Sequence, residues 1–98
     1  MTPPLRIVYF GSPEFAVPPL EALLADAAFD VRLVVTQAPK GQSPVEVVAR
    51  DHGISIYKPD SLRSAEARQP LVDVDADLFI VAAFGLIFRQ RTLDIPRF

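Results

Sequence analysis

Two short turns carry the residues of this chain that are best placed for chemistry. One, at residues 11–15, follows an apolar run that ends at Phe10, and the other, at residues 84–87, closes a second apolar run. In open α/β sheets, ligands bind at the carboxyl ends of the strands, which is where these turns are expected to lie. Gly85 would leave the backbone open to a flat ring, whose polar groups can pair with main-chain groups. The alternative for both turns is a tight connection without a ligand.

The first turn has the context of a phosphate-binding loop but not its sequence. It lacks both the G-x-G-x-x-G spacing and the Gly-Lys-Ser/Thr ending of a P-loop. Pro13 and Glu14 stand where a pyrophosphate needs small residues and free N–H groups. We interpret Glu14 as a carboxylate that complements a helix dipole rather than as an acid or base. Phe15 is the better functional candidate, as the lining of a pocket, with packing on the sheet as its alternative.

The other polar candidates are better interpreted as structural or solvent-exposed residues than as catalytic or metal-binding ones. His52 is the only histidine and the chain has no cysteine, so the sequence predicts no metal site of the zinc type. His52 falls near the end of an expected helix, where a histidine is ordinary. Asp73, Asp75 and Asp77 precede an apolar run, and we interpret them as solvated loop charges because a calcium loop would need a turn glycine and further ligands.

Composition narrows the class of protein. The 98 residues suit one small domain or part of a larger one, and 50% hydrophobic residues exclude disorder. No apolar run reaches the roughly 18 residues of a membrane helix, and the N-terminus does not resemble a signal peptide. The absence of cysteine fits a reducing, cytoplasmic location. A net charge of -2 makes the chain a poor autonomous binder of nucleic acid.

Strands and helices are expected to alternate along the chain. Pro18 suits the first turn of a helix, and it excludes the preceding Val17 from that helix. Ser43 and Glu46 form a capping box at the start of a second helix. Pro70 limits a third, weak helix. We expect the last strand to be central and buried on both faces. This order predicts an α/β domain with a doubly wound, mostly parallel sheet. The expected strands are 5–10, 31–36, 54–57 and 78–84, and the expected helices are 18–28, 43–53 and 64–69.

Several segments resemble, in order, the beginning of methionyl-tRNA formyltransferases. The most specific is Gly-Ser-Pro-Glu-Phe-Ala-Val-Pro at residues 11–18, which is typical of this family and of the related sugar-nucleotide formyltransferases. The resemblance implies that residues 1–98 are the N-terminal part of a Rossmann-like formyltransferase domain, truncated before its end. The other matching segments are 7–10, 20–24, 34–37, 43–45, 52–54, 58–63 and 82–87.

The resemblance also implies an activity and two binding surfaces. The family moves a formyl group from 10-formyltetrahydrofolate to the amino group of methionine on initiator tRNA, a step of translation initiation. By resemblance, one turn would border the folate pterin and the other would face the aminoacyl end of the tRNA. The folate-binding residues would be Phe84, Gly85, Leu86 and Ile87, and the acceptor-binding residues would be Gly11, Ser12, Pro13, Glu14 and Phe15.

Three departures from the family pattern limit this expectation. The family's catalytic Asn-x-His, Ser-Leu-Leu-Pro and later Asp are absent, so we expect no catalytic residue, no activity and no tight RNA binding in this chain alone. Residues 38–42 stand where the family has a longer basic loop, so either the loop is shortened or part of it is missing from this chain. Arg89 replaces the family's usual proline. Two alternatives stay open: a sugar-nucleotide N-formyltransferase, or a non-catalytic α/β module that pairs through an open sheet edge.

Overall fold

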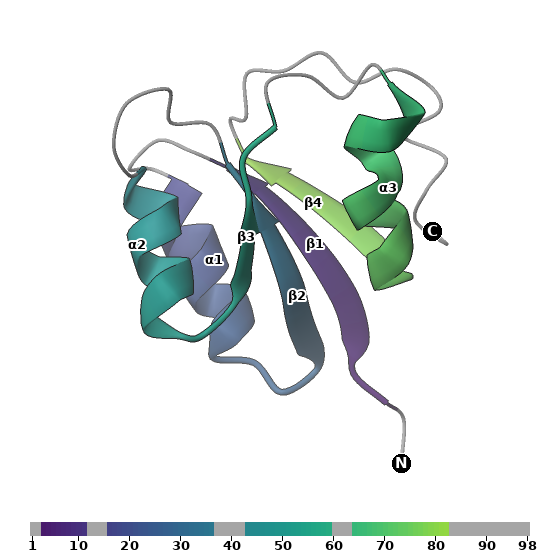
Figure 1. Cartoon of the computed structure of the whole chain (residues 1–98). Helices are drawn as coiled ribbons and strands as arrows, with labels where there is room; N and C mark the ends of the chain where they lie inside the picture. Colours follow the sequence, from purple (N-terminus) through teal and green to yellow (C-terminus); the bar gives the residue numbers. More distant parts are fainter. Residues whose placement is uncertain (1–2, 12–15, 37–42, 60–63, 83–98) are drawn as a thin grey trace.

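Strand and helix alternate through a computed structural model that describes residues 3–11, 16–36, 43–59 and 64–82. The four strands form one parallel sheet in the order β3-β2-β1-β4 (Figure 1). The predicted α/β class with a Rossmann-like parallel sheet is therefore confirmed. The elements are β1 (Leu5–Gly11), α1 (Val17–Leu24), β2 (Phe29–Val35), α2 (Pro44–Asp51), β3 (Ser55–Tyr57), α3 (Ala65–Val74) and β4 (Leu78–Ala82).

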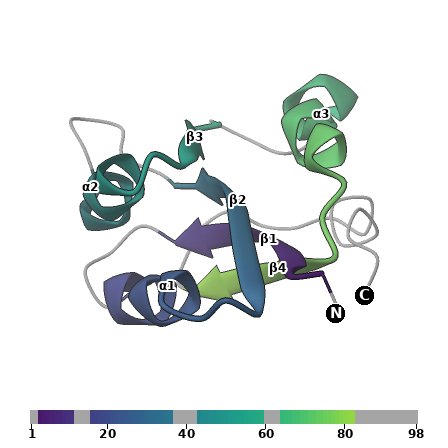
Figure 2. The ribbon, with the colours of Figure 1, turned by 90° about the horizontal axis from the view of Figure 1, so that it is seen from below.

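Helices cover both faces of the sheet. Alternate residues of β1 point to opposite faces, because side chains in a strand have a period of two. Ile7 and Tyr9 pack with residues of α1 and α2, whereas Val8 and Phe10 pack with Leu71 of α3. Figure 2 shows the same division, with α1 and α2 lying apart from α3. All four of these β1 residues are fully buried, as expected for an inner strand of a parallel sheet.

The α1 helix differs from its prediction at both ends. It includes Val17, whose side chain packs against the core and so offsets the crowding by Pro18. It ends at Leu24 rather than near Ala28. The carboxylate of Asp26 accepts a hydrogen bond from the backbone N–H of Ala28, at 2.9 Å, which stabilises a turn in place of a further helical turn.

The α3 helix passes through the proline that was expected to limit it. Pro70 lies inside the helix, which extends to Val74. Proline removes one helical hydrogen bond, but Leu71 beside it is fully buried in the core on that face. The side chain of Ser64 accepts from Ala67 N–H at the start, and Asp75 adopts a left-handed conformation at the end. Packing and caps therefore outweigh the local preference.

The β4 strand is an edge of the described sheet, so the expectation of a central strand buried on both faces was wrong there. It pairs with β1, and Val81 is 49% exposed. The described part of the strand ends at Ala82, so its predicted continuation through residue 84 lies outside the described residues. Packing on β4 comes partly from Phe79, whose ring centroid lies 5.1 Å from that of Phe10.

Candidate functional site

The described ends of β1 and β4 lie side by side at the carboxyl edge of the sheet. Gly11 at the end of β1 pairs with Ala82 at the end of β4. This is the edge of the sheet at which ligands bind in open α/β folds. Of the predicted site residues, only Gly11 is among the described residues. Ser12, Pro13, Glu14, Phe15, Phe84, Gly85, Leu86 and Ile87 lie outside them.

Gly11 is required by its neighbours. A Cβ atom on this residue would stand 2.9 Å from the Cβ of Ala16, 3.0 Å from the carbonyl oxygen of Ala82 and 3.1 Å from Cε2 of Tyr9. Two of these neighbours are backbone or a methyl group attached to it, so they cannot turn away. The glycine thus brings three segments of the chain into contact: β1, the start of α1 and the end of β4.

Tyr9 joins the end of β1 to the start of α1. Its hydroxyl group donates a hydrogen bond to the carbonyl oxygen of Ala16 at 2.5 Å, and the whole residue is buried. Burial raises the pKa of the Tyr9 hydroxyl, which therefore stays protonated and donates. Sequence reasoning placed Tyr9 in a buried strand but gave it no role. The signal was a hydroxyl in a mostly apolar strand, since a buried polar group needs a partner.

The residues on either side of segment 37–42 contact each other. Thr36 and Ser43 are buried, and their hydroxyl oxygens lie 2.7 Å apart. The Ser43 oxygen also accepts the N–H of Glu46 at 3.1 Å, which confirms Ser43 as the predicted cap of α2. The backbone N–H of Thr36 donates to the carbonyl of Tyr57 in β3, at 3.0 Å. Residues 37–42 themselves lie outside the described residues.

Glu46 has a role that the predicted capping box did not include. Its side chain is fully buried, and its carboxylate lies 3.0 Å from the Lys58 ammonium and 2.8 Å from the Arg50 guanidinium. The contact with Lys58 lowers the pKa of Glu46, burial opposes this effect, and Arg50 adds to the lowering. The carboxylate therefore joins α2 to the residue that follows β3. The i, i+4 spacing of Glu46 and Arg50 was the available sequence signal.

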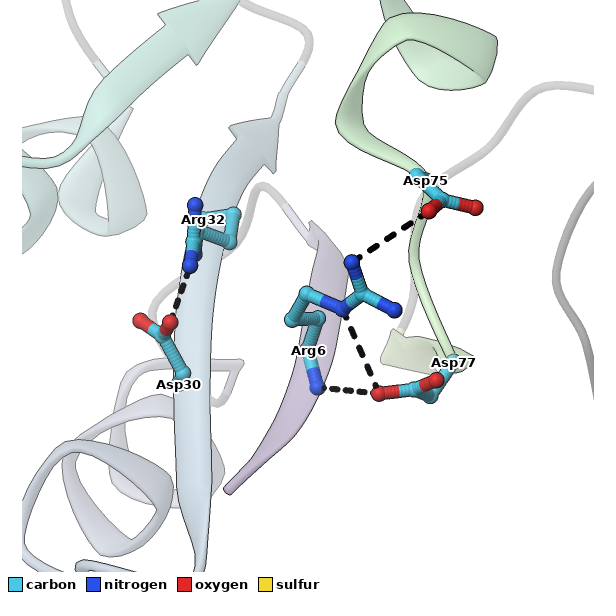
Figure 3. Close-up of polar contacts among 5 residues, drawn as sticks. All are labelled: Arg6, Asp30, Arg32, Asp75 and Asp77. Atoms are coloured by element: carbon cyan, nitrogen blue, oxygen red, sulfur yellow. Dashed lines mark hydrogen bonds and ion pairs between the residues drawn. The ribbon is translucent and has the colours of Figure 1, made fainter. Parts of the chain in front are cut away.

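An ion-pair cluster lies at the opposite, amino edge of the sheet. The backbone N–H of Arg6 donates to the Asp77 carboxylate at 2.8 Å, and the Arg6 guanidinium lies 3.6 Å from Asp77 and 3.3 Å from Asp75 (Figure 3). The interpretation of these aspartates as solvated loop charges was therefore wrong for Asp77, which is 9% exposed. Asp73 is exposed and lies within α3. The cluster fixes the start of β4 to β1.

His52 lies at the end of α2, the position that the sequence predicted for it. It is exposed at the end of α2, with Nδ1 3.0 Å from the carbonyl oxygen of Val48. Gly53 follows in a left-handed conformation, with φ of 68°, and ends the helix as predicted. Within the described ranges, no three acidic, histidine or cysteine side chains come together as metal ligands. No helix there has the length and apolar character to cross a membrane.

Curated relatives identify the family that the sequence resembles. No family model matches the chain. The methionyl-tRNA formyltransferase of Pseudomonas fluorescens (strain SBW25) is 48% identical over 105 residues, which cover 99% of this chain and 33% of the relative. That of Hydrogenovibrio crunogenus is 42% identical, covering 100% of the chain and 34% of the relative, and that of Aromatoleum aromaticum is 46% identical, covering 97% and 32%.

The matches cover only part of the length of each relative. The chain spans about one third of the relatives it matches. The match to the Pseudomonas protein runs over 105 residues although this chain has 98, so that relative contains residues without a counterpart here. Over nearly its whole length, this chain corresponds to a part of the methionyl-tRNA formyltransferases.

Proposed function

We propose that this chain is the N-terminal part of a longer cytoplasmic protein that transfers a formyl group from 10-formyltetrahydrofolate to methionyl-initiator tRNA. The observation that carries the proposal is identity of 42–48% over 97–100% of the chain to proteins of that name. The adjacent ends of β1 and β4 support it, because they give an acceptor and a donor a common edge.

In the proposed reaction, the methionine amino group attacks the formyl carbon of the folate. A new bond forms between that nitrogen and the carbon, the bond from the carbon to the folate nitrogen breaks, and the proton from the amine passes to the folate nitrogen. In our proposal the turn at 11–15 holds the acceptor and the turn at 84–87 holds the folate ring. In our proposal, the groups that stabilise the negative charge developing on the formyl oxygen are supplied by residues outside this chain.

Two assays test the proposal. The full-length protein should formylate methionyl-tRNA with 10-formyltetrahydrofolate, and the 98-residue chain alone should give no turnover above background. Formylation of an amino-sugar nucleotide instead of methionyl-tRNA would favour the sugar-nucleotide alternative. Turnover by the short chain would refute our placement of the chemistry outside it.

The folate side can be tested separately. We expect Gly85→Val in the full-length protein to weaken binding of a folate analogue about tenfold or more, because a side chain would occupy the space of the ring. Thermal unfolding of the variant controls for a general loss of structure. An unchanged affinity would remove this turn from the folate site.

One observation favours the second alternative, a module that pairs through its sheet edge. Among the described residues, β4 is hydrogen-bonded to β1 on one side, carries no charge, and exposes Val81 by 49%. Such an edge can pair with another chain. Light scattering on the 98-residue chain distinguishes the two functions, because a monodisperse monomer would argue against the pairing module.

A further inference from the structure

We propose that Tyr9 is a positioning residue for formyl transfer, and that its hydroxyl group fixes Ala16, the residue after the proposed acceptor segment, relative to Gly11 and the end of β4. The inference rests on the proposed function, in which the two turns at the carboxyl edge carry the two substrates. Tyr9 is fully buried, so it acts through Gly11 and Ala16 rather than by touching a substrate.

The ring of Tyr9 depends on the glycine above it. Its Cε2 atom lies 3.1 Å from the position that a Cβ on Gly11 would occupy. These two residues are on the same face of β1, because they are two positions apart in a strand. The missing side chain of Gly11 therefore leaves the space in which the Tyr9 ring lies at the end of the strand.

The Tyr9 hydroxyl group contacts Ala16, the residue that follows segment 12–15. It donates to the carbonyl of Ala16 at 2.5 Å, and Ala16 is the N-cap residue of α1. Ala16 has no side-chain cap, and α1 is anchored below by the buried Leu20. The hydrogen bond thus fixes the residue at which the chain re-enters the helix, and both ends of the segment 12–15 are held.

The same contacts include the strand that leads to the folate side. The Ala82 carbonyl oxygen lies 3.0 Å from the Cβ position of Gly11, and Ala82 is the partner of Gly11 in the sheet. Tyr9, Gly11, Ala16 and Ala82 therefore form one contact group, with little space for displacement. A shift of Ala16 changes its position relative to Gly11 and the end of β4, and small misplacements of reacting groups have large effects on transfer rates.

The chain contains a matched control. Tyr57, the second of its two tyrosines, donates to the carbonyl of Ala67 at 2.6 Å. This bond joins β3 to α3, not the turn after β1. Tyr9→Phe and Tyr57→Phe each remove one oxygen atom and leave one backbone carbonyl without its donor. A purely structural role for Tyr9 predicts that the two variants behave alike.

The experiment measures initial rates of the full-length protein with each substrate varied in turn. We expect Tyr9→Phe to lower kcat/KM for methionyl-tRNA by about three- to tenfold, with KM for 10-formyltetrahydrofolate within about twofold of the wild type. Tyr57→Phe should leave both within about twofold at a similar shift in melting temperature. Equal kinetics for the two variants would overturn the inference.

Two further outcomes are informative. If Tyr9→Phe does not fold, Gly11→Ala displaces the same group without removing the hydroxyl, and it should lower kcat/KM for methionyl-tRNA by at least as much. Unchanged kinetics in Gly11→Ala would also overturn the inference. A wild-type protein that transfers no formyl group would overturn the proposed function itself, and this role with it, so the two failures are distinct.

Discussion

The two ends of β1 are joined to β4 by different kinds of contact. At the amino end, Arg6 binds Asp77 through charge and a backbone hydrogen bond. At the carboxyl end, Gly11 meets Ala82 and Ala16 through small size, and a buried Tyr9 hydroxyl is the polar contact. At the amino end, the charged and hydrogen-bonding groups of Arg6 and Asp77 pair with each other. The carboxyl end depends on shape, as our proposal requires of an edge where the backbone comes close to substrates.

This difference implies that the amino edge of the sheet contributes to stability alone, whereas the carboxyl edge contributes to stability and to the proposed activity. We expect changes at the amino edge to alter the free energy of unfolding while the kinetic constants stay as they are. Changes at the carboxyl edge should alter both. The predictions that follow test this division, beginning with the largest expected effect.

Asp77→Ala should give the largest loss, about 2–3 kcal/mol in the free energy of unfolding, because it leaves the backbone N–H of Arg6 part-buried without this acceptor. Denaturant titration measures the loss. Asp75→Asn is the control, since Asp75 is largely exposed and asparagine tolerates its left-handed conformation, so the variant should lose less than about 1 kcal/mol. A change in KM for methionyl-tRNA in Asp77→Ala would break the division between the two edges.

The sequence predicts most of this fold because its signals are local. The apolar run of β1, the Ser43 cap and Gly53 at the end of α2 each depend on a few neighbouring residues, and each prediction is confirmed. The course of α3 through Pro70 was not predictable in the same way. It depends on packing between Leu71 and strands that are distant in the sequence.

The candidate site also combines features that the sequence predicted with features that it did not. The position of Gly11 at the end of β1 followed from the sequence. The partner of the Tyr9 hydroxyl did not, although a buried hydroxyl implied that a partner exists. The Arg6–Asp77 contact joins residues 71 positions apart, which no local pattern indicates. The roles of the two turns stay predictions, since all but Gly11 of their residues lie outside the described part of the chain.

Glu46→Gln should cost about 2 kcal/mol at neutral pH, because Arg50 and Lys58 lose the charge that they share. The pKa of Glu46 is lowered below its ordinary value of 4.5 in the folded protein. The stability that this carboxylate contributes is therefore present above about pH 4.5 and is lost as the pH falls through the lower, folded-state pKa. The difference from wild type should shrink accordingly.

Unfolding curves at several pH values check this prediction. Glu21→Gln is the control, because Glu21 is exposed on α1 and should show a small difference at every pH. A Glu46→Gln difference that stays constant from neutral to acid pH would mean that the buried ion pairs contribute nothing through the charge of this residue.

Ser43→Ala should cost about 1.5 kcal/mol, since it removes a helix cap and a buried contact with the Thr36 hydroxyl. Ser64→Ala is the matched control. Ser64 caps α3 in the same way, with its oxygen 3.0 Å from the N–H of Ala67, but it is exposed. We expect it to cost about 0.5–1 kcal/mol in the same denaturant titration. Equal losses would show that the Thr36 contact adds nothing to the cap.

Asp30→Ala should have the smallest effect, about 0.5 kcal/mol or less, although its contact with Arg32 is short at 2.5 Å. Both side chains are exposed, by 38% and 55%, so water and salt compete for the pair. Wild type and variant should become indistinguishable at about 1 M salt. A loss as large as that of Asp77→Ala would mean that distance, rather than burial and a backbone partner, sets the strength of these ion pairs. The amino edge would then be held by surface charge, and its contrast with the carboxyl edge would disappear.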